Sequence, residues 1–88
     1  MRKALGFFEI RSYVAACYAA DIMVKAADVT IKDFNVVGSG VISVVIEGEV
    51  AAVQSAIAAA QDGASHMADV IGINVIPRPE SDMDILFG

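Results

Sequence analysis

The sequence predicts an α+β fold of the ferredoxin-like, split β-α-β type (βαββαβ), with an antiparallel sheet and two helices on one face. Stretches with strand or helix character follow in the order strand, helix, strand, strand, helix, strand, which is the order of this fold. A Gly-Ser-Gly turn at residues 38–40 joins the second and third strands as a hairpin. The helices are rich in alanine, which lets a helix lie close to a sheet.

The chain begins with a strand and a helix. Residues 5–10 are rich in aromatic and branched side chains, and Ser12 is placed to cap a helix over residues 13–27. Asp21 lies four residues before Lys25, the spacing of an ion pair on a helix surface. The helix residues expected on the buried side are Val14, Cys17, Ile22 and Val24.

The hairpin that follows has two unlike strands. Residues 29–37 have mixed polarity, which favours an edge or interface strand. Residues 41–46 are almost continuously apolar, which is typical of a central strand. Between them, Gly38 and Gly40 can adopt positive φ angles without a steric penalty. We therefore expect a tip with almost no side chain.

The second helix is predicted over residues 50–65 from the helical spacing of its larger apolar residues. These are Val50, Val53, Ile57 and Ala60. Residues 47–49 are expected to turn the chain into this helix, with carboxylates at its N-terminal end, where the helix dipole favours negative charge.

The last predicted strand, residues 70–76, is expected to stop at Pro77 because proline lacks a backbone donor. The tail, residues 80–88, is acidic at its start and apolar at its end, which predicts one short C-terminal helix. We interpret residues 1–88 as one domain with its core over about residues 4–79.

Composition indicates a protein that associates. Hydrophobic residues make up 57% of the 88 residues, above the roughly 45–50% of an ordinary soluble chain, so large subunit interfaces are expected. The longest apolar run, residues 13–20, is too short to span a membrane. The net charge is −5 and no basic patch carries interleaved aromatics, so nucleic acid is not expected as a partner. Cys17 cannot form an internal disulfide, suits a reducing cytoplasm and is interpreted as a small buried hydrophobe.

The sequence does not predict an enzyme, a cofactor or a metal site. Cys17 and His66 are placed on the two predicted helices, and they form the one nucleophile–base couple that stays open. Ser39 has no neighbour in sequence that would activate it. The turn around Ser39 joins strand to strand, with no helix N-terminus or lysine after it, so it is not a phosphate-binding loop.

Three segments resemble, in order and spacing, the hallmark segments of bacterial microcompartment (BMC-domain) shell proteins of the single-domain, hexamer-forming class. They are residues 20–27, residues 38–40 and residues 75–79. The resemblance covers residues 4 to about 79. The Pro-Arg-Pro form of the third segment looks more like the shells of catabolic organelles, which enclose aldehyde-producing enzymes, than like carboxysome shells.

The resemblance implies a homo-hexamer that tiles edge to edge, with other hexamers, trimers and vertex pentamers, into a microcompartment shell in the cytoplasm. Targeting helices of enclosed enzymes are further implied partners. In such proteins the lysine matching Lys25 lies along the hexamer edge, and the arginine matching Arg78 reaches into a pocket of the neighbouring hexamer. Asp28 also matches an edge position, but relatives commonly carry Asn there.

The resemblance also implies that Gly38, Ser39 and Gly40 line a central pore. Six hairpin tips around one axis leave room only for glycine and a small residue, and their N–H groups and hydroxyls would form a polar ring for small polar metabolites. Val36 and Glu47 stand where relatives often carry Lys and Arg, so we expect a less positive, more acidic face.

An alternative interpretation fits the same size and composition. A regulatory domain of ferredoxin-like fold that binds a small effector at a subunit interface would also have alanine-rich helices and would also associate. Oligomer size separates the two, because an effector domain is expected to form dimers to tetramers.

Overall fold

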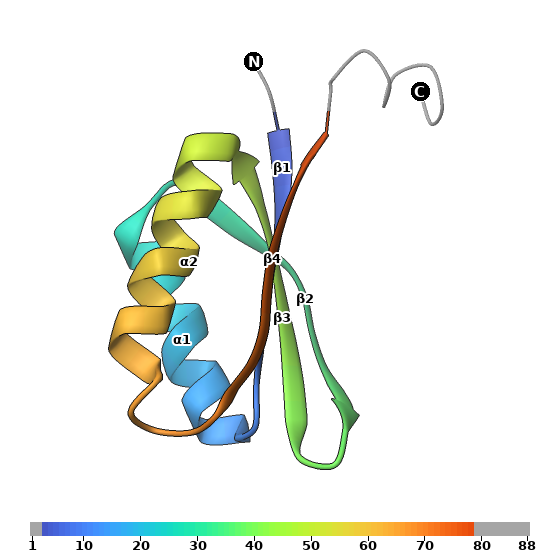
Figure 1. The fold of residues 1–88 in the computed structure, drawn as a ribbon. Coiled ribbons are helices and arrows are strands. Elements are labelled where there is room, and N and C mark those ends of the chain that lie inside the picture. The colour runs from blue at the N-terminus through green and yellow to red at the C-terminus, as the bar shows by residue number, and fades with distance from the viewer. Residues whose placement is uncertain (1–2, 79–88) are drawn as a thin grey trace.

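The computed structural model describes residues 3–78, which form a four-stranded antiparallel sheet with both helices on one face, as predicted (Figure 1). The sheet order is β2-β3-β1-β4, so the two central strands are β3 and β1. The elements are β1 (Lys3–Ile10), α1 (Tyr13–Ala26), β2 (Val29–Gly38), β3 (Val41–Glu49), α2 (Val50–Ala64) and β4 (Val70–Arg78). The predicted C-terminal helix of residues 80–88 lies outside the described residues.

Alternation along β1 separates the two faces of the sheet. Ala4, Phe8 and Ile10 are fully buried, whereas Phe7 and Glu9 between them are only half-buried. This is the period of two expected when helices cover one face and leave the other open. The core therefore lies between the helices and the face of β1 that carries Phe8.

Helix α1 begins where the sequence predicts, but it buries a different face. Ser12 caps it, since its hydroxyl accepts a hydrogen bond of 3.1 Å from the backbone N–H of Ala15. The predicted burial of Val14, Cys17 and Val24 is wrong, because these side chains are exposed, and Ile22 is only half-buried. The buried residues are Ala15, Ala16, Ala19, Ala20 and Met23. The buried face of α1 thus consists mainly of small side chains, and its larger apolar side chains lie elsewhere.

Helix α2 buries the residues that its spacing predicts. Val53, Ile57 and Ala60 are buried, and Val50 is partly buried against the core. The helix lies over Gly6 of β1, where a Cβ atom would be only 2.6 Å from Cγ1 of Val53. A glycine at this point of β1 is what allows the close approach of helix and sheet.

Two predicted boundaries are wrong. Residues 47–49 are not a turn, because β3 continues through Glu49, and Glu49 makes no side-chain capping bond to α2. Pro77 does not stop β4, which pairs with β1 as far as Arg78. Proline is tolerated there because β4 is an edge strand, in which one side of the backbone has no strand partner.

The other edge strand, β2, is confirmed as an edge and is irregular. Its pairing with β3 shifts register between Ile31 and Asp33 and again between Val36 and Gly38. A shift of this kind leaves one residue of the strand out of the ladder and increases the local twist. The hairpin of β2 and β3 is therefore twisted before it reaches its tip.

The contact at Gly6 gives a test of the packing. We expect Gly6→Ala to lower the free energy of unfolding by about 1–3 kcal/mol, since the methyl group would overlap a stiff, buried valine. Gly63→Ala is the control, because its methyl group would overlap Cδ1 at the far end of the flexible, half-buried Ile22 side chain, with Cγ1 at an ordinary contact distance of 3.7 Å. Urea unfolding at one protein concentration compares the two. Equal losses in both variants would contradict this account of the packing.

Candidate functional site: the hairpin tip and the opposite end of the sheet

The tip of the β2–β3 hairpin is made almost entirely of backbone. Gly38, Ser39 and Gly40 have φ angles of 139°, 53° and 79°, all positive. All three residues are exposed, and a Cβ atom added to Gly38 would meet nothing within 4 Å. The predicted turn is confirmed as a turn. The exposed surface of the tip therefore consists of peptide groups and the hydroxyl group of Ser39.

Arg11 contacts this tip through its side chain, a contact that the sequence did not predict. Its guanidinium Nη1 donates a hydrogen bond of 3.1 Å to the carbonyl oxygen of Ser39, 28 residues away in sequence. The backbone N–H of Arg11 donates to the carbonyl oxygen of Asp69 at 2.9 Å, which fixes the start of the side chain. The available signal was register, because Arg11 directly follows β1, and Ile10 pairs with Ile42 next to the turn.

Two of the residues expected at a subunit edge, Asp28 and Arg78, lie at the end of the sheet opposite to the tip. Asp28 directly precedes Val29, which pairs with Gly48 near the end of β3, and Arg78 pairs with Lys3, which itself pairs with Glu49. Lys25 is in the last turn of α1, with 74% of its side chain exposed, and forms the predicted ion pair with Asp21 at 3.1 Å. Asp28 is exposed just before β2. Arg78 ends β4, and its backbone pairs with Lys3.

A hollow of about 350 Å³ joins part of this end. It is lined by Lys3, Asp28, Thr30, Glu47, Gly48, Glu49 and Ala52. Lys3 lines this hollow together with Asp28, and its backbone pairs with Arg78. Asp28 and the backbone of Arg78 therefore lie in the same region of the sheet. Strand β3 runs from the tip at Val41 to this hollow at Glu49, a span of about 25 Å at roughly 3.3 Å per residue. The tip and the edge residues are two separate sites.

Glu47 belongs to the second of these sites. It lies opposite Thr30 on β2 and forms an ion pair of 3.7 Å with Lys32. The expectation of a less positive tip was based on Val36 and Glu47. Only Val36 lies near the tip. The negative charge of Glu47 therefore lies at the end of the hairpin opposite to the tip.

Large apolar side chains cover much of the described surface. Two groups stand out, one on the outer face of α1 and one beside the hairpin tip. The side chains are Tyr13, Val14, Tyr18, Val24, Ile31, Val36, Val37, Met67, Ile71, Ile73 and Ile76. An exposed apolar surface of this extent is typical of a protein that buries it against partners. The prediction that the chain has more apolar surface than its core can hide agrees with this.

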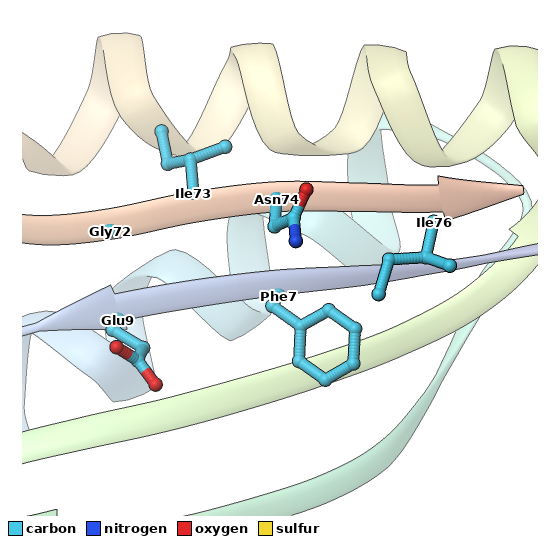
Figure 2. A pocket seen from close by; sticks show the side chains of 6 residues that line it. All are labelled: Phe7, Glu9, Gly72, Ile73, Asn74 and Ile76. Carbon is cyan, nitrogen blue, oxygen red and sulfur yellow. The ribbon is translucent and has the colours of Figure 1, made fainter.

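The open face of the sheet has its own shallow hollow, of about 370 Å³. Figure 2 shows Phe7 and Glu9 of β1 beside Asn74 and Ile76 of β4, with Ile73 pointing the opposite way. Glu9 is the one ionisable residue that lines it. Because Glu9 is the single ionisable group of this lining, the lining offers no nucleophile–base pair.

The described residues hold no cluster suited to a metal. Over residues 3–78, no three His, Cys, Asp or Glu side chains come together in a way that could ligate an ion. In the same part of the chain, no helix has the length and apolar character needed to cross a membrane.

Comparison with known proteins agrees with this geometry. A family model described as the BMC domain matches residues 4–79. The bacterial microcompartment shell protein PduA of Citrobacter freundii is 39% identical over 83 residues, which cover 94% of this chain and 89% of that protein. The shell protein EutM of Escherichia coli K12 is 36% identical over 85 residues, 97% of this chain and 88% of that protein.

A solved structure gives the same result for the fold. The crystal structure of a microcompartment protein from Desulfitobacterium hafniense superposes with a TM-score of 0.79 at 36% identity. The match covers 85% of this chain and 41% of that chain, so this chain spans less than half of that protein. With the fold, the family match and the similarity to these shell proteins define a small α+β protein of the microcompartment shell class. The chain belongs to the BMC domain family.

The backbone of the tip can be tested by substitution. We expect Gly38→Ala to lower the free energy of unfolding by about 1–3 kcal/mol, because a φ of 139° is a conformation that residues with a side chain rarely adopt. No neighbouring atom would be displaced, so the loss would come from the backbone alone. Ser39→Asn is the control, since asparagine tolerates the left-handed conformation at φ 53°. A stable Gly38→Ala variant with an unchanged unfolding midpoint would show that the tip is built differently.

Proposed function

We propose that this BMC-domain shell protein forms cyclic hexamers that tile into the facets of a microcompartment shell, with the six hairpin tips around a central pore. The observation that carries the proposal is the separation of the two sites: the tip adjoins the start of β3, and the region of Asp28 and the backbone of Arg78 adjoins its end. Such a separation suits a ring, in which one end of each subunit lies at the axis and the other at the rim.

The chemistry of the tip supports a pore for small polar solutes. Glycine at two of the three positions lets six tips approach one another, and Ser39 adds one hydroxyl from each subunit. Peptide groups and hydroxyls can replace part of the hydration shell of a polar metabolite, whereas a volatile aldehyde, with one carbonyl acceptor and no donor, gains less from them. The ring would then retain an aldehyde while admitting polar substrates.

The other end supports lateral contact. Lys25 is well exposed beside its partner Asp21, so its long side chain is available to pack against a neighbouring hexamer. Arg78 follows Pro77 and is held on an extended edge strand. Asp28 brings a carboxylate to the same rim, where it is suited to pair with a lysine or arginine across the contact.

The exposed apolar side chains supply the contacts between subunits within the ring. Val36 and Val37 beside the tip are 66% and 57% exposed, and Val14 at the start of α1 is 69% exposed. Burying apolar surface stabilises by about 25 cal/mol for each Å² removed from water, so closing a ring over such residues is strongly favourable. Other shell proteins of the same cytoplasmic organelle, and targeting helices of its enclosed enzymes, are the further partners.

Oligomer size tests the ring. We expect sedimentation and native mass measurement to give a hexamer, and electron microscopy at low salt to reveal extended sheets or tubes. Dimers to tetramers, with a melting temperature that rises when a small effector is added, would instead favour the regulatory-domain alternative. The ring proposal would then be wrong.

Substitution of Lys25 tests the edge. Lys25→Ala is expected to leave the hexamer intact, since the pair with Asp21 is exposed and contributes about 0.3–0.5 kcal/mol. It is also expected to abolish extended sheets, and Arg78→Ala is expected to weaken them. Lys32→Ala is the matched control, because it removes another exposed, ion-paired lysine that is not one of the three residues assigned to the edge contact. Normal sheets from Lys25→Ala would contradict the role given to this residue.

A further inference from the structure

We propose that Arg11 makes the mouth of the pore selective for small anions, above all carboxylates. This inference rests on the proposed function, because the selectivity arises only when the tips surround a pore. Its starting point is the hydrogen bond from the Arg11 guanidinium to the carbonyl oxygen of Ser39, 3.1 Å long. That bond brings a permanent positive charge to the three residues that would frame the opening.

The position of this charge is set from both sides of Arg11. Its backbone N–H is held by the carbonyl oxygen of Asp69, and the next residue, Ser12, caps α1. The side chain then runs along the turn, where its Cγ atom lies 3.9 Å from the place that a Cβ of Gly40 would occupy. An arginine that is anchored at its backbone and at its guanidinium is a preorganised part of the tip.

The charge is not neutralised within the described chain. Neither the ion pair of Lys25 with Asp21 nor that of Lys32 with Glu47 involves Arg11. The carboxylate of Glu9, two residues before it, is directed over β4, with Oε1 3.6 Å from the place of a Gly72 Cβ. Asp69 contacts Arg11 through its backbone. The carbonyl of Ser39 is thus the one acceptor that the described structure gives to this guanidinium.

The donors that remain fit a carboxylate. A guanidinium carries five N–H donors in a planar fork, and one of them is used by Ser39. A small carboxylate can accept two parallel bonds from such a fork, whereas a neutral aldehyde cannot. Six forks around a narrow, low-dielectric opening would also raise the local concentration of anions by about tenfold or more.

This inference revises the expectation of a less positive pore. Val36 does lack the lysine found in relatives, and beside the tip it is neutral and apolar. Arg11 supplies a cation from a different element, at the junction of β1 and α1. The sequence around the hairpin alone does not contain this charge.

The test measures ion selectivity of single hexamers in a planar lipid bilayer under a gradient of potassium chloride and then of potassium acetate. The wild type is expected to prefer anions, and Arg11→Gln is expected to lower the anion-to-cation permeability ratio by about tenfold. Arg11→Lys is expected to keep the preference for anions but to lose preference for acetate over chloride, since an ammonium has no planar fork. Lys32→Gln removes one positive charge about 20 Å from the tip at roughly 3.3 Å per residue, so it is expected to change nothing.

The outcomes separate this inference from the pore itself. Channels whose selectivity is the same in the wild type and Arg11→Gln would overturn the role of Arg11 and leave the pore intact. Hexamers without conductance would overturn the pore, and this inference with it. Should Arg11→Gln not assemble, Arg11→Lys decides, because an unchanged acetate-to-chloride ratio in that variant contradicts recognition by the fork.

Discussion

The close packing of two alanine-rich helices on one sheet is the constraint on which the rest of this structure depends. Helix α1 meets the sheet with four alanines and Met23, and α2 lies directly over Gly6. Small side chains inside bring the layers close together, which leaves little volume for larger ones. The larger apolar residues of α1, such as Val14 and Val24, consequently face outward. In the proposed ring, association would bury the apolar side chains that folding leaves exposed.

The same packing fixes where the two candidate sites lie. Because β1 and β3 pair in register from Lys3 with Glu49 to Ile10 with Ile42, the start of α1 is held next to the hairpin turn. The end of α1 is carried in the opposite direction, toward Asp28. A single sheet thus keeps the tip and the edge residues about 25 Å apart at roughly 3.3 Å per residue. In the proposed ring, the length of β3 therefore sets the distance between the central axis, where the tip lies, and the outer rim, where the edge residues lie.

Most of the fold could be predicted from the sequence, because strands, helices and the hairpin follow from local patterns. Ser12 as a cap and Asp21 with Lys25 as a pair are interactions between near neighbours, and both are confirmed. The buried face of α1 could not be predicted from side-chain size, because the sheet selects the face with the smallest side chains. The strand character of Glu49 depends on its pairing with Lys3, which is distant in sequence.

The candidate sites divide in the same way. Residues 38–40 could be located from their own sequence, since three small residues between apolar runs predict an exposed turn. Arg11 could not, because its importance comes from a contact with a residue 28 positions away. Lys25, Asp28 and Arg78 were placed by resemblance, and the structure adds that Asp28 and the backbone of Arg78 lie at one end of the sheet. Their roles at an edge stay predictions.

The irregular edge strands make it harder for this protein to form fibres. Unpaired strand edges can recruit further strands and grow into fibres, a danger for any small protein with much exposed apolar surface. Here β4 carries Pro77, which has no backbone donor, and β2 breaks its ladder twice before the turn. The outer edge of β2 is therefore irregular, and the outer edge of β4 has near its end one residue that cannot donate a hydrogen bond. In the proposed shell, side-chain contacts at the rim extend the assembly as a flat layer, whereas backbone pairing of strand edges would extend it as a fibre.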